Sequence, residues 1–329
     1  GKFHRIEVNV KDRPDLSVLV QRGFYSAPPP DDAPRNEAKR NEAKGKTNDA
    51  APGEQTKTLF AALRSPFPKT ALQTSLALNY YDLPPDGMIL TASVQVDFEA
   101  SKATDGAASQ PERAEIIGAL YNDKGEVKKT FQRGLSFAQA ASNASPNARR
   151  YLILSNNMAV TPGLYQVRVA ARDPRTGRTG SAMQWLEVPD LAKGALAMSS
   201  IFIGERSDKE AAPASGEQSV GAPVVINVDR RFARSSRMRF MTYVYNAARP
   251  QSASPDVAVQ VQVFRDEQPV VTSPLSKMDT EGVTDFVRLP YAAELPLGGL
   301  TPGSYVLKIT AIDRVAKKSV TQRTRFIVE

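Results

Sequence analysis

The chain has 329 residues, a net charge of +8, 41% hydrophobic and 24% charged residues, one histidine and no cysteine. No apolar run approaches the roughly 20 residues that a membrane-crossing helix needs. The lack of cysteine excludes a disulfide scaffold, a thiol nucleophile and thiolate metal sites. A single histidine, His4, excludes Ser-His-Asp chemistry elsewhere in the chain and any multi-histidine metal site. The length predicts two domains, and we expect no catalytic residues, no metal and no cofactor.

Residues 1–26 have the pattern of a β-hairpin. Apolar residues alternate on either side of a turn at Asp12–Asp15, with Ile6, Val8 and Val10 before it and Leu16, Val18 and Val20 after it. A lone two-stranded hairpin is marginally stable in water. We therefore expect the hairpin to dock on another domain. Because the sequence starts abruptly at Gly1, we interpret the hairpin as the last part of an upstream domain.

Residues 27–66 read as a flexible linker. The segment contains Pro28–Pro30 and the duplicated pentad of Asn36–Arg40 and Asn41–Gly45, and it has almost no aromatic or β-branched residues. At its end, 55–64 fits a short amphipathic helix with Leu59, Phe60 and Leu63 on one side, ended by Pro66 and Pro68.

Residues 67–190 carry the signal of a β-sandwich. Short apolar runs are separated by Gly, Pro, Asn or Asp, and 122–125 (Asn-Asp-Lys-Gly) predicts a hairpin turn before Val127. About seven strands in such a length are typical of an immunoglobulin-like sandwich. The expected strands are 72–78, 88–98, 115–121, 151–154, 165–169 and 183–188.

Residues 191–329 repeat this pattern. The segment Thr161–Asp173 aligns without gaps with Thr301–Asp313, with identical Thr, Pro, Gly, Tyr, Ala and Asp and apolar residues alternating in step. Upstream, Leu120–Val127 matches Val263–Val270. We therefore predict an all-β chain of two tandem immunoglobulin- or fibronectin-like sandwiches, at 67–190 and 191–329, preceded by the hairpin and the linker.

The shared Thr-Pro-Gly-x-Tyr element predicts structural roles for its tyrosines and for the aspartates that follow. A Tyr near the start of a sandwich's penultimate strand often bonds back to the backbone. Tyr165 and Tyr305 are therefore expected to pin a corner, and Asp173 and Asp313 to form turns.

Five arginines within ten residues are the one local excess of charge: Arg230, Arg231, Arg234, Arg237 and Arg239. Such a patch can contact an anionic polymer or lipid surface. The alternative is a solvated turn leading into a strand, since Met238 and Phe240 alternate with arginines. No stacking platform or recognised motif accompanies the patch, so nucleic acid is not the expected partner.

Several segments resemble a known family. Phe3–Val10, followed by Val18–Tyr25 with its Gln-Arg-Gly-Phe-Tyr phrase, is similar to the closing strands of a von Willebrand factor A-like domain, in particular that of the acidobacterial VWFA-related proteins. Ala61–Pro68 and Phe240–Ala247 resemble regions downstream of that domain. The resemblance implies a secreted, periplasmic or cell-surface protein whose A-like domain lies upstream. The Asp-x-Ser-x-Ser loop that holds a metal ion in such domains does not occur here, so no metal site carries over.

Besides anionic-polymer or membrane-surface binding by the arginine cluster, three functions remain open from the sequence. The leading hypothesis is a non-catalytic extracytoplasmic module, the tail of an adhesion-type protein, that serves as a stalk or binds protein. The alternative is a glycan-binding sandwich, for which Tyr80–Asp82, Tyr243 and Tyr245 are the candidate residues, although Tyr243 and Tyr245 also fit half-buried sheet positions. An enzyme is the least favoured, because Glu112 and Glu115, the nearest paired carboxylates, point to opposite faces of a strand.

Overall fold

The computed structural model describes residues 3–5, 11, 23–25, 54–98, 112–137, 150–205, 225–250 and 254–329. These residues form several β-sheets of mainly antiparallel pairs, and Arg231–Phe232 pairs parallel with Ile327–Val328. By contacts the chain divides into two compact units. The first holds Gly1–Leu76, Val94–Leu154 and Gly163–Glu187, and the second holds Ala77–Ser93, Ser155–Pro162 and Val188–Glu329.

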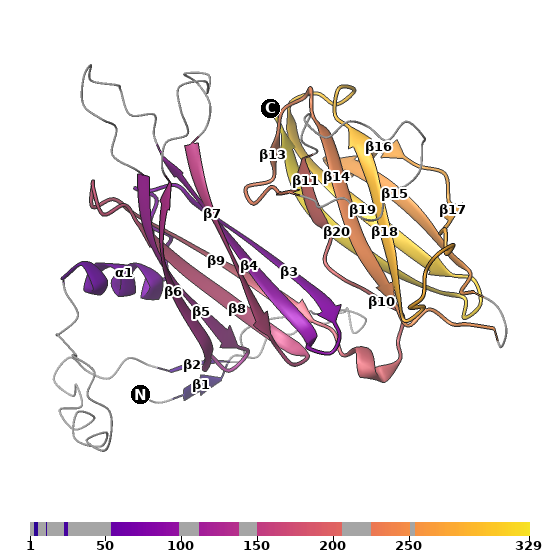
Figure 1. The fold of residues 1–329 in the computed structure, drawn as a ribbon, viewed down its shortest axis with the longest axis horizontal. Helices are drawn as coiled ribbons and strands as arrows, with labels where there is room; N and C mark the ends of the chain where they lie inside the picture. The colour runs from indigo at the N-terminus through magenta and orange to yellow at the C-terminus, as the bar shows by residue number, and fades with distance from the viewer. Residues whose placement is uncertain are drawn as a thin grey trace. The chain divides into compact units, whose positions relative to one another are not determined.

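Two sheets make up the first sandwich (Figure 1). The three-stranded sheet has the order β3-β4-β7, and the four-stranded sheet has the order β6-β5-β8-β9. Their bounds are β3 Thr74–Leu83, β4 Gly87–Phe98, β5 Glu112–Asn122, β6 Val127–Phe137, β7 Arg150–Ala159, β8 Gly163–Arg172 and β9 Thr179–Val188. Each of the six expected runs lies in or overlaps one of these strands, and β6 is an additional strand that starts at the predicted turn.

The second sandwich follows the short 3₁₀ helix Leu191–Lys193. One sheet has the order β10-β14-β11-β12 with β18 also on β14, and the other has the order β13-β20-β19-β15-β16 with β17 also on β15. The bounds of the first set are β10 Ala197–Met198, β11 Phe202–Glu205, β12 Val225–Ile226, β14 Arg237–Tyr245 and β18 Arg288–Pro296. Those of the second are β13 Arg231–Phe232, β15 Val257–Arg265, β16 Gln268–Thr272, β17 Ser276–Lys277, β19 Gly303–Asp313 and β20 Lys318–Val328.

The strand order confirms the predicted tandem sandwich. The series β6-β5-β8-β9 in the first unit corresponds to β16-β15-β19-β20 in the second. The first hairpin of each series has its register shift at aligned residues, between Leu120 and Tyr121 and between Val263 and Phe264. Gly163 and Gly303, the aligned first residues of β8 and β19, share an unusual φ of 154° and 151°. The two sandwiches therefore share strand order, the position of a register shift and a backbone angle, which indicates that they are two copies of one fold.

The end of the hairpin formed by β3 and β4 belongs to the second unit, whereas the sequence places the boundary between the sandwiches at 190/191. The side-chain amide of Asn79 donates to the carbonyl of Ile201 at 3.1 Å, and the Tyr80 amide donates to the Ser200 hydroxyl at 2.9 Å. Both contacts lie within the second unit. Strand alternation indicates which face of a strand is apolar, but not which distant segment covers it. The packing of the end of the β3–β4 hairpin within the second unit could therefore not be predicted from the sequence.

The helix predicted at the end of the linker is present as α1, Glu54–Arg64. Leu59, Ala62 and Leu63 are buried against Ile117, Ala119 and Ala170 of β5 and β8, while Phe60, expected on the same side, is 42% exposed. Figure 1 shows α1 against this sheet. The segment therefore packs as part of the first unit. Most of the linker lies outside the described residues.

At the N-terminus, β1 (Phe3–Arg5) pairs antiparallel with β2 (Gly23–Tyr25). This pairing is that expected of the two ends of the predicted hairpin. Its alternating apolar residues and its turn lie outside the described residues. Among the described helices, none has the length and apolar character needed to cross a membrane.

The aspartates that follow the repeated strands form the predicted turns. One carboxylate oxygen of Asp173 accepts the Arg175 amide at 2.9 Å. One oxygen of Asp313 accepts the amides of Val315 and Ala316, both at 2.9 Å. The Asn122 side chain likewise accepts the amides of Lys124 and Glu126 in the predicted turn between β5 and β6.

Tyr305 pins its corner as predicted, because its hydroxyl donates to the Thr301 carbonyl at 2.6 Å. The ring is 2% exposed and stacks on Phe326 at 5.5 Å between centroids. Tyr165, its counterpart in the first unit, is 7% exposed.

We expect Tyr305→Phe to lower the free energy of unfolding by about 0.5–1.5 kcal/mol, because the Thr301 carbonyl loses a donor while the ring keeps its packing. Urea denaturation followed by circular dichroism measures this change. Tyr151→Phe is the control, since Tyr151 is 47% exposed. Equal midpoints for Tyr305→Phe and the wild type would contradict a pinning role for the hydroxyl.

Candidate functional site

The five clustered arginines lie in different environments around β13 and the start of β14. Arg237 and Arg234 are exposed, and the Arg234 side chain donates to the Gly298 carbonyl at 3.1 Å. Arg231 pairs with the Glu329 side chain at 2.6 Å. Arg239 is 8% exposed, and burial lowers the pKa of Arg230. Anion contact by this cluster stays a prediction, and Arg234 and Arg237 are its most accessible members.

Two of the tyrosines considered for glycan contact have roles in the fold. The Tyr80 hydroxyl donates to the Met198 carbonyl at 2.7 Å and accepts from the Gln322 side chain at 2.8 Å. Tyr245, expected to be half-buried, is fully buried, and its hydroxyl accepts the Asp82 amide at 2.9 Å. These two rings are therefore not available to a ligand.

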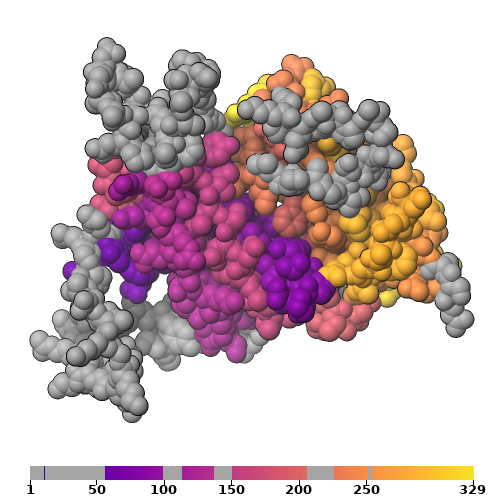
Figure 2. All heavy atoms as spheres, in the orientation of Figure 1, coloured from indigo at the N-terminus to yellow at the C-terminus, as the bar shows by residue number. Residues whose placement is uncertain are grey.

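The other two, Tyr81 and Tyr243, are half-buried and line an open cleft of about 650 Å³ within the second unit. It is lined by the end of β3, by residues of β14, β15 and β18, and by the segment from Ser273 to Asp285. In Figure 2 the end of the β3–β4 hairpin (purple) lies against the later part of the second unit (orange). Volumes of 300–1,000 Å³ are typical of small-molecule sites.

A row of charged side chains crosses the cleft. The Arg288 guanidinium lies 3.7 Å from the Asp82 carboxylate and donates through Nε to Asp285 at 2.7 Å. A second guanidinium nitrogen of Arg288 also bonds the same carboxylate. The hydrogen bond from Arg288 lowers the pKa of Asp285. The guanidinium thus has a carboxylate on each side.

The cleft also collects tyrosine hydroxyls that the fold does not use. Tyr81, Tyr243 and Tyr291 all line it, and none of their hydroxyls has a hydrogen-bond partner among the described residues. In Tyr80, Tyr245 and Tyr305, by contrast, the hydroxyl is bonded within the fold. These three phenols of the cleft are free to form hydrogen bonds with water or with a bound ligand.

Burial raises the pKa of Tyr245 far above its ordinary value of 10.0, and burial also raises the pKa of Tyr291. A group whose pKa is raised by folding contributes its full stability below its unfolded pKa. That stability is lost as the pH rises through the folded value.

We therefore expect the folded chain to become less stable above about pH 10. Absorbance at 295 nm should show tyrosines that ionise at a higher pH in the folded chain than in the denatured chain, and Tyr245→Phe should reduce this difference. Ionisation of all tyrosines at the same pH in the folded and the denatured chain would contradict this expectation.

Sequence reasoning identified Tyr81, Asp82 and Tyr243 but missed Asp285, Arg288 and Tyr291. The only signal for the missed residues was one strand, β18, that carries both a charged and an aromatic side chain around Pro290. Asp82 and Arg288 are about 200 residues apart in the chain. Only the fold brings the two sets together.

Of the two carboxylates weighed as a catalytic pair, only Glu115 has a described side chain. Glu115 faces Arg172 on β8, with its carboxylate 3.3 Å from the guanidinium. The side chains of Glu112 and His4 lie outside the described residues. Across the described part of the chain, no group of three or more His, Asp or Glu side chains is placed to hold a metal ion.

No known protein family matches the chain, and no curated protein matches it either. Among solved structures, the fibronectin(III)-like modules of Clostridium thermocellum CbhA are 10% identical over 73% of this chain and 85% of that one, with a TM-score of 0.19. A calcium-binding mutant of Bacteroides uniformis β-glucuronidase 2 is 10% identical over 72% of this chain but only 26% of that one, with a TM-score of 0.26. The BSP domain of a biofilm-associated protein is 11% identical over 80% and 52%, with a TM-score of 0.21. At such scores these likenesses say nothing about ligand or activity, and the sandwich fold rests on the strand order described above.

Proposed function

We propose that the chain is a non-catalytic, extracytoplasmic structural and protein-interaction module, the tail of an adhesion-type protein. The observation that carries this proposal is the repeat of one sandwich, with the same strand order and aligned bulges, in a single chain. Repetition of a compact fold lengthens a protein and multiplies its surface without requiring new chemistry. The resemblance of 3–25 to the end of a von Willebrand factor A-like domain adds the expectation of an upstream adhesion domain.

Location and activity test the first part of this proposal. A membrane-impermeant biotinylation reagent applied to intact source cells should label the protein. Purified chain should turn over no ester, peptide, phosphate or glycoside substrate above the buffer rate. Labelling only after lysis would contradict the extracytoplasmic location, and turnover proportional to protein concentration would contradict the non-catalytic assignment.

The intact mass and N-terminal sequence of the native protein test the second part. A species well above 35.8 kDa with an Asp-x-Ser-x-Ser loop upstream supports the tail of a metal-dependent adhesion protein. A species near 35.8 kDa that begins at Gly1 would remove the basis of that assignment.

Glycan binding is the second candidate function. The specific observation that favours it is the cleft in which Tyr81, Asp82 and Tyr243, named from the sequence, lie together with Tyr291 and Arg288.

A further inference from the structure

We propose that the cleft of the second unit is a binding site for a neutral oligosaccharide, with Tyr81, Tyr243 and Tyr291 as its contact residues. This inference rests on glycan binding, the second candidate function, and it names the site and the class of ligand. It does not depend on the upstream adhesion domain.

The aromatic rings of the site are held in place before any ligand arrives. Tyr81 makes an edge-on contact with Phe202 at 5.8 Å between ring centroids. Tyr243 stacks on the fully buried Tyr245 at 6.3 Å, with 20° between the ring planes. Fixed rings lose little conformational entropy on binding, and each offers an apolar face beside a polar hydroxyl. A sugar ring, with an apolar C–H face and a rim of hydroxyls, matches both features.

The polar groups of the site favour an uncharged ligand. The Arg288 guanidinium lies between Asp82 and Asp285, so it is not a free cation for an anionic ligand. The two carboxylates are likewise engaged with the guanidinium and are not a free anionic pocket for a cationic ligand. What the row offers is a fixed set of donors and acceptors, which suits hydroxyl groups that both donate and accept.

The three phenols complete this set. Their hydroxyls have no hydrogen-bond partner among the described residues, and each can donate one bond and accept others. Tyr291 is partly buried beside the hydrophobic core of the second unit.

The strongest competing ligand is a lysine-rich peptide, which exposed carboxylates of the cleft would attract. Asp279 and Glu281 line the cleft and are exposed, as is Lys277. Exposed charges of this kind are screened by salt and contribute little to affinity. The tyrosines and the ion-paired row, whose two carboxylates are both engaged by Arg288, therefore favour the oligosaccharide.

Isothermal titration at physiological salt tests the proposal on the full chain. The probes are neutral hexasaccharides of β-1,4-linked glucose, xylose and mannose, with a hexamer of galacturonic acid and a hexalysine peptide as charged comparators. We expect at least one neutral hexasaccharide to bind and neither charged probe to compete with it. Absence of binding by every neutral probe at millimolar concentration overturns the proposal, as does binding of hexalysine alone.

Variants that remove only the hydroxyl locate the site. Tyr243→Phe and Tyr291→Phe should each weaken binding about three- to tenfold, because each deletes one hydrogen bond while keeping the ring. The triple variant that adds Tyr81→Phe should weaken it further. Tyr151→Phe, which changes an exposed tyrosine of the first unit outside the cleft, should leave affinity unchanged.

The folded state of each variant is checked by its thermal midpoint. Wild-type affinity in a folded triple variant would overturn the site assignment even if a hexasaccharide binds. Cell-surface labelling and the turnover assays are independent of this titration. A titration without binding therefore does not contradict the proposed extracytoplasmic module. A negative result in the labelling or turnover assays does not change what the titration says about the cleft.

Discussion

Asp313→Ala is expected to lower the free energy of unfolding of the second sandwich by about 3–5 kcal/mol. The side chain is 1% exposed, and its carboxylate accepts three backbone amides. Two of these belong to the turn that follows β19, but the third is the Ala248 amide, 2.7 Å away and 65 residues earlier in the chain. Truncation would remove the charged acceptor of all three amides at once, and with it the bond that ties the turn to the segment at Ala248.

The repeat supplies a matched control for this variant. Asp173, the aligned residue of the first sandwich, is also buried, at 4% exposed. It accepts the Arg175 amide and the Thr176 hydroxyl, both within its own turn. We expect Asp173→Ala to cost about 1–2 kcal/mol, less than Asp313→Ala, because its carboxylate has no described bond to a distant segment like that from Ala248 to Asp313. Urea denaturation followed by circular dichroism measures both, and an equal or reversed order would contradict the bridging role of Asp313.

This aspartate also illustrates what the sequence contains and what it omits. The turn after the repeated strand could be predicted, since Asp side chains bond nearby backbone amides. The bond to Ala248 could not, because no local pattern records which distant segment passes beside a turn. The same limit applies to Phe60, whose place in an amphipathic pattern did not decide its exposure of 42%.

The candidate site shows the same division. Tyr81, Asp82 and Tyr243 could be selected as aromatic and polar residues close together in two short runs. Which of the candidate tyrosines are buried and which line the cleft depends on individual hydrogen bonds, such as that from the Asp82 amide to the Tyr245 hydroxyl. The residues missed, Asp285, Arg288 and Tyr291, join the site because β18 pairs with β14, where Tyr243 lies opposite Pro290. Sheet pairing across 47 residues is set by tertiary packing, and periodicity within either strand cannot reveal it.

Gly180→Ala is expected to be among the most destabilising single-methyl changes in the first unit, at about 3 kcal/mol or more. A Cβ at this position would lie 1.9 Å from the Leu72 carbonyl oxygen and 2.2 Å from the Thr74 hydroxyl. The neighbouring backbone cannot yield without breaking bonds on both sides, because the Leu72 amide donates to the Thr179 carbonyl at 3.0 Å and the Ser181 amide donates to Lys69 at 2.9 Å. The close approach joins β9 to the segment before β3 through the bridge between Thr70 and Gly180.

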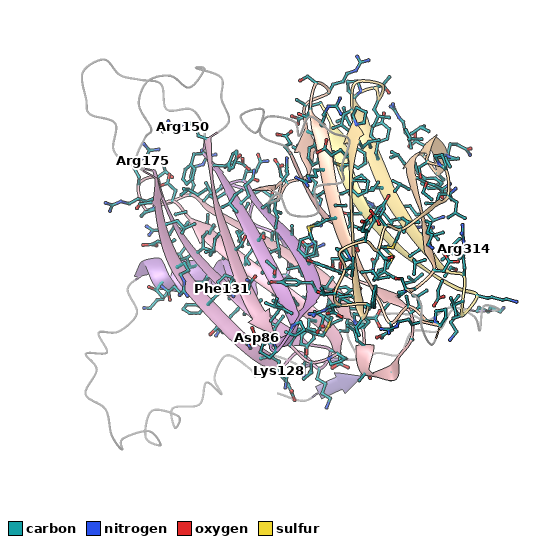
Figure 3. The ribbon with its side chains drawn as sticks, turned by 45° about the vertical axis from the view of Figure 1, so that its right-hand side comes forward. Asp86, Lys128, Phe131, Arg150, Arg175 and Arg314 are labelled. Atoms are coloured by element: carbon teal, nitrogen blue, oxygen red, sulfur yellow. The ribbon has the colours of Figure 1, made fainter. Side chains whose placement is uncertain are left out.

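Two further glycine-to-alanine variants provide comparisons with smaller expected losses of stability. At Gly118 an added Cβ would meet the Phe131 ring at 2.1 Å, and Phe131, labelled in Figure 3, lies opposite it on β6. Because β6 is the outer strand of its sheet and a side chain can turn where a backbone cannot, Gly118→Ala should cost about 1–3 kcal/mol. At Gly134 no atom lies within 4 Å, so Gly134→Ala should be neutral or slightly stabilising.

The chain's single tryptophan, Trp185, provides the measurement, because it lies on β9 only five residues from Gly180 and is 37% exposed. Urea unfolding followed by its fluorescence should give midpoints in the order Gly134→Ala, Gly118→Ala, Gly180→Ala, from highest to lowest, with unchanged slopes. A midpoint for Gly180→Ala near that of Gly134→Ala would mean that β9 does not approach the chain before β3 so closely. Such a result would contradict the β-bridge between Thr70 and Gly180 at this edge of the first sandwich.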